Sequence, residues 1–254
     1  FIYSLDFERK PHPRYHHIPA FEMIKDSITA HRGCYGKCSF CAIHSHQGTK
    51  IVSRSQKSIF NEIKKIAQKP DFKSSLSDIG GPSANMYASY CKKGGCENPN
   101  CLNKNGETCP FLVSGIEEYS KLLSSALKIK GIKNVFIGSG LRFDPILMDE
   151  KLLTQILKNH SSGQIKIAPE SGSDSVLKLM NKPLASVFQS FKNLADKIAR
   201  KEQISRKIIP YIIVGHPGEG EKELEETLKF LKTNQLEGNQ FQIFTPTPMT
   251  LSSA

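Results

Sequence analysis

Short apolar runs alternate with longer amphipathic segments from about residue 20 to the end of the chain. In the longer segments apolar side chains recur every three or four residues, which is typical of helices that cover a core with one face. The short runs end in Gly, Pro or a polar residue, as strands that lead into turns do. The predicted strands are 26–30, 75–79, 134–137, 164–168, 208–214 and 240–245, and the predicted helices are 58–67, 116–130, 145–159, 173–180, 187–201 and 222–232.

About six βα units follow from this alternation, which predicts an α/β fold with parallel strands. Such strands lie in an open sheet or close toward a barrel. Residues 1–22 contain three prolines and predict an irregular lead-in, whereas residues 23–254 form the predicted core. The core has one long insertion at 83–113, which is rich in Asn, Cys, Gly and Lys and weak in helical pattern.

The unusual residues lie where predicted strands end. Four strands run into the loops Gly80-Gly81-Pro82, Gly138-Ser139-Gly140, Glu170-Ser171-Gly172 and Gly215-His216-Pro217-Gly218. Glycines at any one of these positions can simply make a βα turn. Because the carboxyl ends of parallel strands share one rim, four such loops together favour a ligand site.

Composition narrows the choice of function classes. The chain of 254 residues has 38% hydrophobic residues and no apolar run near the roughly 20 residues that would span a membrane, so we expect a soluble, cytoplasmic protein. It begins at Phe1 rather than Met, which indicates a piece of a longer protein. The formal charge of +11 allows nucleic-acid binding, but lysines spread over helical segments without an arginine-rich block do not favour it.

The seven cysteines form two tight groups, which in a chain without a secretory signal indicate metal ligation more than disulfides. The first group is C-x3-C-x2-C, formed by Cys34, Cys38 and Cys41. Three thiolates suit a [4Fe–4S] cluster that keeps one iron open, whereas structural zinc normally takes four ligands. Zinc with His44 or His46 as the fourth ligand is the alternative.

The C-x3-C-x2-C loop, with the aromatic Phe40 before its last cysteine, is similar to the signature of the radical S-adenosylmethionine (SAM) superfamily. Within it, the chain resembles the YgiQ family at residues 11–15, 31–48, 53–55, 77–82, 133–144, 167–170, 209–218 and 246–249. One departure is Ser171, where the family usually has histidine. The resemblance implies a partial (β/α)6 TIM-like barrel in which the cluster cleaves SAM to a 5′-deoxyadenosyl radical. It also implies a one-electron reductant such as flavodoxin or ferredoxin, and leaves the substrate unknown.

The resemblance further implies which residues meet SAM. The backbone of the glycine turn, Gly80 and Gly81, would contact its amino group, and Ser139 and Glu170 would meet its ribose or methionine part. Lys182 would pair with the SAM carboxylate unless it is a surface lysine at a helix end. The segment from Tyr211 to Gly215 would line the adenine pocket.

The second cysteine group lies in the insertion and consists of Cys91, Cys96, Cys101 and Cys109. These four thiols could hold an auxiliary Fe–S cluster or a structural zinc, or be disulfides or free thiols. Their spacing is looser than the paired C-x2-C of a zinc ribbon, which ranks iron first.

A non-catalytic Fe–S or zinc protein that carries electrons or binds RNA is the alternative function. An electron carrier needs no SAM-shaped rim, so the glycine turn, Glu170 and the motif on the fifth strand favour the enzyme.

Overall fold

A computed structural model describes residues 2–15, 18–96, 101–103, 105–236 and 240–254. Parts of the predicted lead-in (1 and 16–17) and of the predicted insertion (97–100 and 104) therefore lie outside the described residues. Over the rest of the chain, the alternation of strands and helices appears as the hydrophobic pattern predicts.

In the described part of the chain, six parallel segments follow one another across the molecule in chain order. They are β1 (Ser27–Thr29), β4 (Ser75–Leu76) with β5 (Asp78–Gly80), β8 (Asn134–Val135), β9 (Gln164–Glu170), β10 (Lys207–Val214) and β11 (Gln240–Ile243). The second segment pairs through β5 with β1 and through β4 with β8. A single parallel bridge, Leu141 with Ile167, connects the loop after β8 to β9, which pairs with β10 and then β11.

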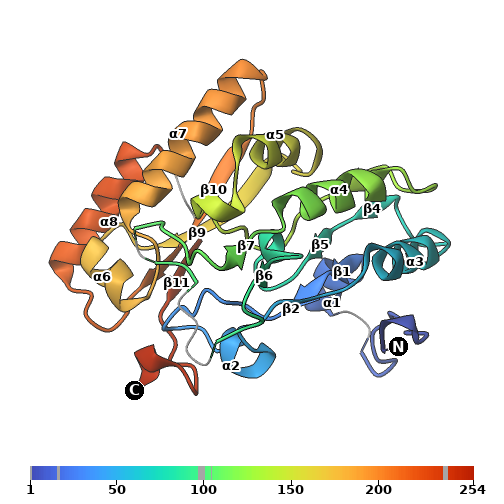
Figure 1. The fold of residues 1–254 in the computed structure, drawn as a ribbon, viewed down its shortest axis with the longest axis horizontal. Helices are drawn as coiled ribbons and strands as arrows, with labels where there is room; N and C mark the ends of the chain where they lie inside the picture. Colours follow the sequence, from blue (N-terminus) through green and yellow to red (C-terminus); the bar gives the residue numbers. More distant parts are fainter. Residues whose placement is uncertain (1, 16–17, 97–100, 104, 237–239) are drawn as a thin grey trace.

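From α3 on the right of Figure 1, the helices α4, α5, α7 and α8 follow toward the left, and the short α6 lies at the lower left. They are α3 (Gln56–Ala67), α4 (Ile116–Leu127), α5 (Glu150–Asn159), α6 (Asp174–Leu179), α7 (Ala185–Lys201) and α8 (Glu221–Thr233). Among the described residues, no helix is both long enough and apolar enough to cross a membrane.

One helix begins later than the sequence pattern predicts. Residues Pro145–Leu147 form a short 3-10 turn (η3), and α5 starts only after Asp149. The Asp149 carboxylate accepts a hydrogen bond from the Leu152 backbone N–H at 2.6 Å. This contact satisfies one of the free N–H groups at the helix end, so the cap rather than the apolar period sets the start.

The core lies between the strands and the inner faces of the helices. Fully buried strand residues such as Leu76, Ile79 and Val135 belong to the same apolar cluster as Ile63 of α3 and Leu153 of α5. The two cysteine groups lie outside this cluster, on segments that contain only short elements. These are β2 (His31–Arg32), α2 (Ile43–Gln47), β3 (Val52–Ser53), η2 (Ala84–Met86), β6 (Tyr90–Cys91) and β7 (Leu112–Val113).

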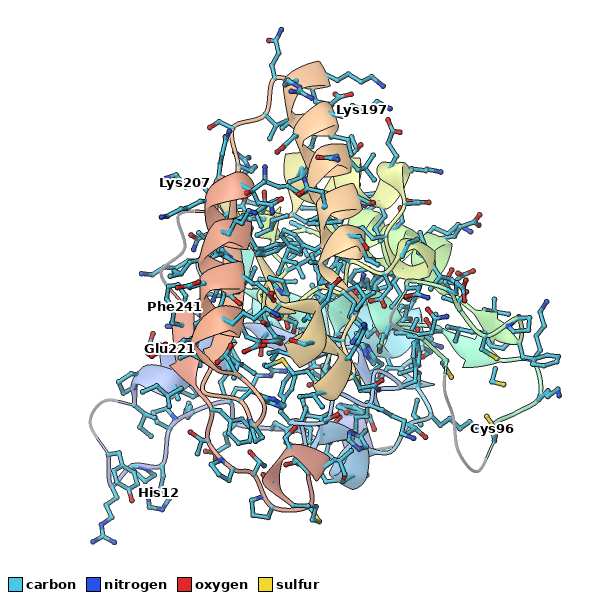
Figure 2. All side chains as sticks on the ribbon, turned by 90° about the vertical axis from the view of Figure 1, so that its left-hand side faces the viewer. His12, Cys96, Lys197, Lys207, Glu221 and Phe241 are labelled. Atoms are coloured by element: carbon cyan, nitrogen blue, oxygen red, sulfur yellow. The ribbon has the colours of Figure 1, made fainter. Side chains whose placement is uncertain are left out.

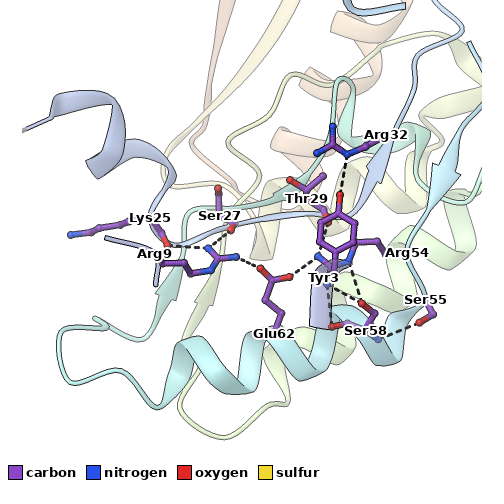
Figure 3. Close-up of polar contacts among 10 residues, drawn as sticks. All are labelled: Tyr3, Arg9, Lys25, Ser27, Thr29, Arg32, Arg54, Ser55, Ser58 and Glu62. Carbon is purple, nitrogen blue, oxygen red and sulfur yellow. Dashed lines mark hydrogen bonds and ion pairs between the residues drawn. The ribbon is translucent and has the colours of Figure 1, made fainter. Parts of the chain in front are cut away.

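The N-terminal segment is held against α3 by a partly buried ion-pair network (Figure 3). Glu62 of α3 pairs with Arg9 and, at 2.6 Å, with Arg54. The Arg54 guanidinium lies 3.9 Å from the ring centroid of Tyr3, which is in the turn η1 (Ile2–Ser4). A short helix, α1 (Pro19–Ile24), ends the segment, so the predicted boundary after residue 22 falls inside a helix.

We predict that Leu153→Ala lowers the free energy of unfolding by about 2–5 kcal/mol, because it removes a fully buried side chain and leaves a cavity. Leu228→Ala on α8 is the matched control, since Leu228 is 53% exposed. Urea denaturation of both variants measures the difference. Equal losses would contradict the position of the core described above.

Candidate active site

The first cysteine loop leaves β2 and is closed by backbone contacts. The Cys34 N–H donates to the Gly48 carbonyl at 3.0 Å, and the Cys41 N–H donates to the Cys38 carbonyl at 3.1 Å. Gly33 has a φ of +90°, and a Cβ there would collide with the carbonyl oxygen of Lys50. Only glycine fits this position, so the local sequence fixes a tight turn before the first cysteine.

The three thiols of this loop lie close enough to influence one another. Burial raises the pKa of the Cys34 thiol, and the neighbouring Cys38 raises it further. Burial also raises the pKa of the Cys41 thiol, again with a contribution from Cys38. Gathering partly dehydrated thiols at one place disfavours their anionic form unless a cation compensates.

Arg142 supplies a buried positive charge beside these thiols. Its Nη1 lies 3.8 Å from the Cys38 Sγ, while Nε and Nη2 donate to the Asp144 carboxylate at 2.7 and 3.2 Å. Burial alone would lower the pKa of Arg142, but Asp144 and the two nearest thiols raise it above its ordinary value. A Cβ at Gly36 would lie 2.6 Å from Nη1, so glycine is needed there to admit the guanidinium.

Sequence reasoning gave no role to Arg142 or Asp144. Both fall within the stretch 133–144 that carries the family resemblance, but nothing in their spacing indicates a contact with Cys38, which is 104 residues away along the chain. The loop after β8 makes that contact only because the fold brings it across the rim.

Glu170 and Lys182 meet at the end of β9. Their Nζ and Oε1 atoms are 3.8 Å apart, and both side chains are nearly buried. Burial raises the pKa of Glu170, and the charges of Lys182 and Arg142 oppose that rise. The structure thus places Lys182 inside the molecule and not on its surface. Glu170 also has a φ of +72°, a strained backbone conformation for a residue with a side chain.

The glycine turn at the end of β5 packs against two polar side chains. A Cβ at Gly80 would collide with the Ser139 hydroxyl, and one at Gly81 would lie 2.5 Å from the His31 ring. The Ser139 hydroxyl itself donates to Asp78, whose other oxygen accepts from the backbone N–H groups of Gly138 and Ser139 at 2.9 and 3.0 Å. Ser139 therefore already has a partner within the protein, in the carboxylate before the glycine turn.

His31 is a feature that sequence reasoning missed. Its side chain is completely buried, yet neither ring nitrogen has a hydrogen-bond partner among the residues that the structure describes. Burial lowers the pKa of His31 to about 4, so the ring is neutral near pH 7 and offers one donor and one acceptor. It lines a cavity of about 300 Å³ together with Gly80, Gly81 and Ser139.

Three other predicted residues line a second cavity. Phe40, Glu170 and Tyr211 contribute to a space of about 660 Å³, next to Ile213 of β10 and Phe244. Gly215 follows β10 with a φ of +77°, and its N–H donates to the Glu219 carboxylate. The structure thus brings Phe40, Glu170 and Tyr211 together, whereas Gly215 lies outside the residues that line this cavity.

A match to the radical SAM superfamily extends over residues 28–231, which includes the first cysteine loop and all the strand ends described above except that of β11. This chain belongs to the radical SAM superfamily. The match confirms the predicted superfamily, whose cofactors are a [4Fe–4S] cluster and SAM.

Among relatives, the chain is 43% identical over 275 residues to a UPF0313 protein of Bacteroides thetaiotaomicron, covering 99% of this chain and 43% of the relative. It is 42% identical over 257 residues to a UPF0313 protein of Methanocella arvoryzae, with the same coverage of 99% and 43%. The chain therefore spans less than half the length of these relatives.

Two solved structures share the fold at low sequence identity. The radical SAM methyltransferase TsrM from Kitasatospora setae aligns with a TM-score of 0.60 and 13% identity over 89% of this chain and 37% of that one. Methylornithine synthase PylB aligns with a TM-score of 0.54 and 14% identity over 91% of this chain and 58% of that one. They confirm the predicted fold class, a partial barrel of the radical SAM type.

The donor set of the first loop fits the cluster that the superfamily uses. Among the described residues, no three Cys, His, Asp or Glu side chains converge tightly enough to hold a single metal ion. In a cubane each cysteine binds a different iron, so its sulfurs stay further apart than around one ion. The three cysteines of this loop match the three protein ligands of a [4Fe–4S] cluster that keeps one iron open, whereas a closed zinc site normally takes four.

We predict that Gly81→Ala destabilises the protein by about 1–3 kcal/mol, because the new methyl group must displace the buried His31 ring. Gly140→Ala is the matched control, since a Cβ there meets no atom within 4 Å. Urea denaturation gives the energies, and the NMR signals of the His31 ring report its displacement. An unmoved His31 ring in Gly81→Ala would contradict the packing described here.

Proposed function

We propose that this chain carries the SAM-cleaving site of a radical SAM enzyme, with Cys34, Cys38 and Cys41 as the cluster ligands. When bound, the cluster supplies the electron that breaks the sulfonium C–S bond of SAM, giving methionine and a 5′-deoxyadenosyl radical. The observation that carries the proposal is the meeting of three thiols and a buried arginine on a rim lined by two cavities. The protein acts by binding, orienting and excluding water.

The buried arginine has a defined task in this proposal. Three thiolates add negative charge to a partly buried loop, and Arg142 offsets part of that charge while Asp144 fixes its orientation. The Nη1 group faces Cys38, so it can donate toward the sulfur without leaving Asp144. We infer that Arg142 orients and stabilises the loaded loop.

The proposed SAM position runs between the two cavities. The Gly80-Gly81 turn lines the smaller cavity, where we place the SAM amino group, and the neutral His31 ring beside it offers an unused donor and acceptor. Glu170 reaches the other cavity and can accept hydrogen bonds from the ribose hydroxyls or the methionine part. Lys182 stands next to Glu170 and carries the positive charge suited to the SAM carboxylate.

The flat walls of the larger cavity suit the adenine ring. Phe40 and Tyr211 line it with the apolar Ile213 and Phe244, and Gly215 follows directly after this stretch of β10. Aromatic and apolar surfaces of this kind bury a planar ring without requiring charged partners. We place the adenine there.

We further propose the YgiQ family as the branch of the superfamily, on the motifs quoted from the sequence. The substrate is unassigned, because the residues named here serve SAM and leave the second substrate unspecified. The reductant is a low-potential one-electron donor such as flavodoxin or ferredoxin. In this proposal residues 23–254 form the catalytic core with the insertion at 83–113, and nucleic acid is not a favoured partner.

Replacing Cys34, Cys38 and Cys41 together by Ala should abolish formation of 5′-deoxyadenosine from SAM under dithionite, because no ligands remain for the cluster. The measurement is anaerobic reconstitution followed by chromatography of the products. The control replaces His44 and His46 by Ala, which removes the alternative zinc ligands and should leave the yield within about twofold, a change of ~0.4 kcal/mol in barrier. An unchanged yield in the cysteine variant would refute the proposed function.

Glu170→Gln should weaken SAM binding by about tenfold or more, because hydrogen bonds to charged groups contribute roughly 1.5–3 kcal/mol. Iron content should stay unchanged, since Glu170 is not a cluster ligand in this proposal. Glu150→Gln is the matched control, because that carboxylate lies on α5 and is 46% exposed. Calorimetric titration of cluster-loaded protein with SAM measures the affinities. Equal affinity in Glu170→Gln and the parent would remove Glu170 from the SAM site.

A further inference from the structure

The second cysteine group lies on two short hairpins beside the first cysteine loop. β6 pairs with β7 in antiparallel fashion, with Cys91 opposite Leu112. The Lys92 N–H donates to the Phe111 carbonyl at 2.9 Å, which extends this pairing by one contact. Cys91 is therefore held at the base of the insertion by backbone hydrogen bonds on both sides.

The second hairpin brings Cys101 and Cys109 together. The Cys109 N–H donates to the Cys101 carbonyl at 3.0 Å, and Leu102 and Thr108 form an antiparallel bridge next to it. At the tip, the Asn103 side-chain oxygen accepts from the Glu107 N–H at 2.8 Å. These backbone contacts bring Cys101 and Cys109 together, although they are eight residues apart in the sequence.

The four cysteines lie near one another. Cys91, Cys96 and Cys101 line the same cavity, and the backbone of Cys109 is hydrogen-bonded to that of Cys101. Figure 2 shows Cys96 at the right of the view, with α8 at the left.

The insertion has little else to hold it in place. Its elements β6 and β7 have two residues each. Within the part of the chain that the structure describes, the buried apolar cluster beside it consists of Tyr35, Met86, Leu102, Leu112 and Leu147. Cores this small normally need a disulfide or a metal to stay ordered. All seven cysteines are free thiols in the structure, so no disulfide supplies that stabilisation.

The cysteines also border a space between the insertion and the first cysteine loop. Cys91, Cys96 and Cys101 line a cavity of about 460 Å³, and Tyr35 and Ile51 form part of its opposite wall. Cys34, Cys101 and Cys109 all pack against the same small apolar cluster. The second group is therefore adjacent to the first, but its thiols come from separate segments.

We propose that Cys91, Cys96, Cys101 and Cys109 hold a second iron–sulfur cluster, separate from the proposed SAM-cleaving site. Four thiolates would bind every iron of a [4Fe–4S] cubane and leave none open, so this cluster would not bind SAM. The spacing of these four cysteines along the chain is looser than the paired C-x2-C of a zinc ribbon, which favours the cluster over zinc.

The test uses the full chain with Cys34, Cys38 and Cys41 replaced by Ala, reconstituted anaerobically with iron and sulfide. This variant lacks the proposed SAM-cleaving site, so the result does not depend on that proposal. We expect about four irons per chain, against about eight in the parent protein, and after reduction an EPR signal of a cubane that added SAM does not change. No iron in the variant would overturn the proposal, and so would one zinc per chain in place of iron.

Alkylation of the folded triple variant provides a second measurement. In the loaded state the four remaining thiols should resist iodoacetamide, and after the iron is removed by a chelator all four should react. Cys96→Ser, added to the triple variant, changes an exposed residue and should cause faster loss of iron with an unchanged far-UV spectrum. Rapid alkylation of all four thiols in the iron-loaded state would overturn the proposal.

Discussion

The buried ion pair between Arg142 and Asp144 joins three loops of the rim. A guanidinium keeps its proton at any physiological pH, so once buried it requires an acceptor that cannot move away. Asp144 supplies that acceptor, and Asn85 fixes the same loop by donating to the carbonyls of Arg142 and Leu147 at 2.7 and 2.8 Å. The remaining Arg142 nitrogen faces Cys38. The loops after β2, β5 and β8 are thereby held in one arrangement.

Much of the fold could be predicted because the apolar period of each element is local. The order of strands and helices can be predicted from the apolar period. The break in the second strand at Ser77 and the late start of α5 cannot. Ser77 lies between β4 and β5, which pair with different neighbours, and Asp149 caps α5 through a side-chain hydrogen bond. Both depend on contacts that a repeat of apolar residues does not encode.

The site was predictable only where residue types carry the chemistry by themselves. Three cysteines in a short loop indicate a cluster whether or not they are buried. A glycine turn at a strand end indicates that another group comes close to the backbone. Lys182 and His31 are different, because the type of a residue does not show whether a lysine or a histidine is buried or exposed. Their burial, one beside Glu170 and the other against Gly81, results from segments far apart in the chain meeting at the rim.

The segment before β1 is part of the barrel's support. Arg9 donates to the carbonyls of Lys25 and Ser27 at 3.2 and 3.0 Å as well as pairing with Glu62, so it ties the entry of β1 to α3 (Figure 3). A shortened fragment that began at residue 23 would lose Arg9 and leave two backbone acceptors and one oxygen of Glu62 without this donor. The smallest fragment that preserves the first strand in its present setting therefore starts upstream of Arg9.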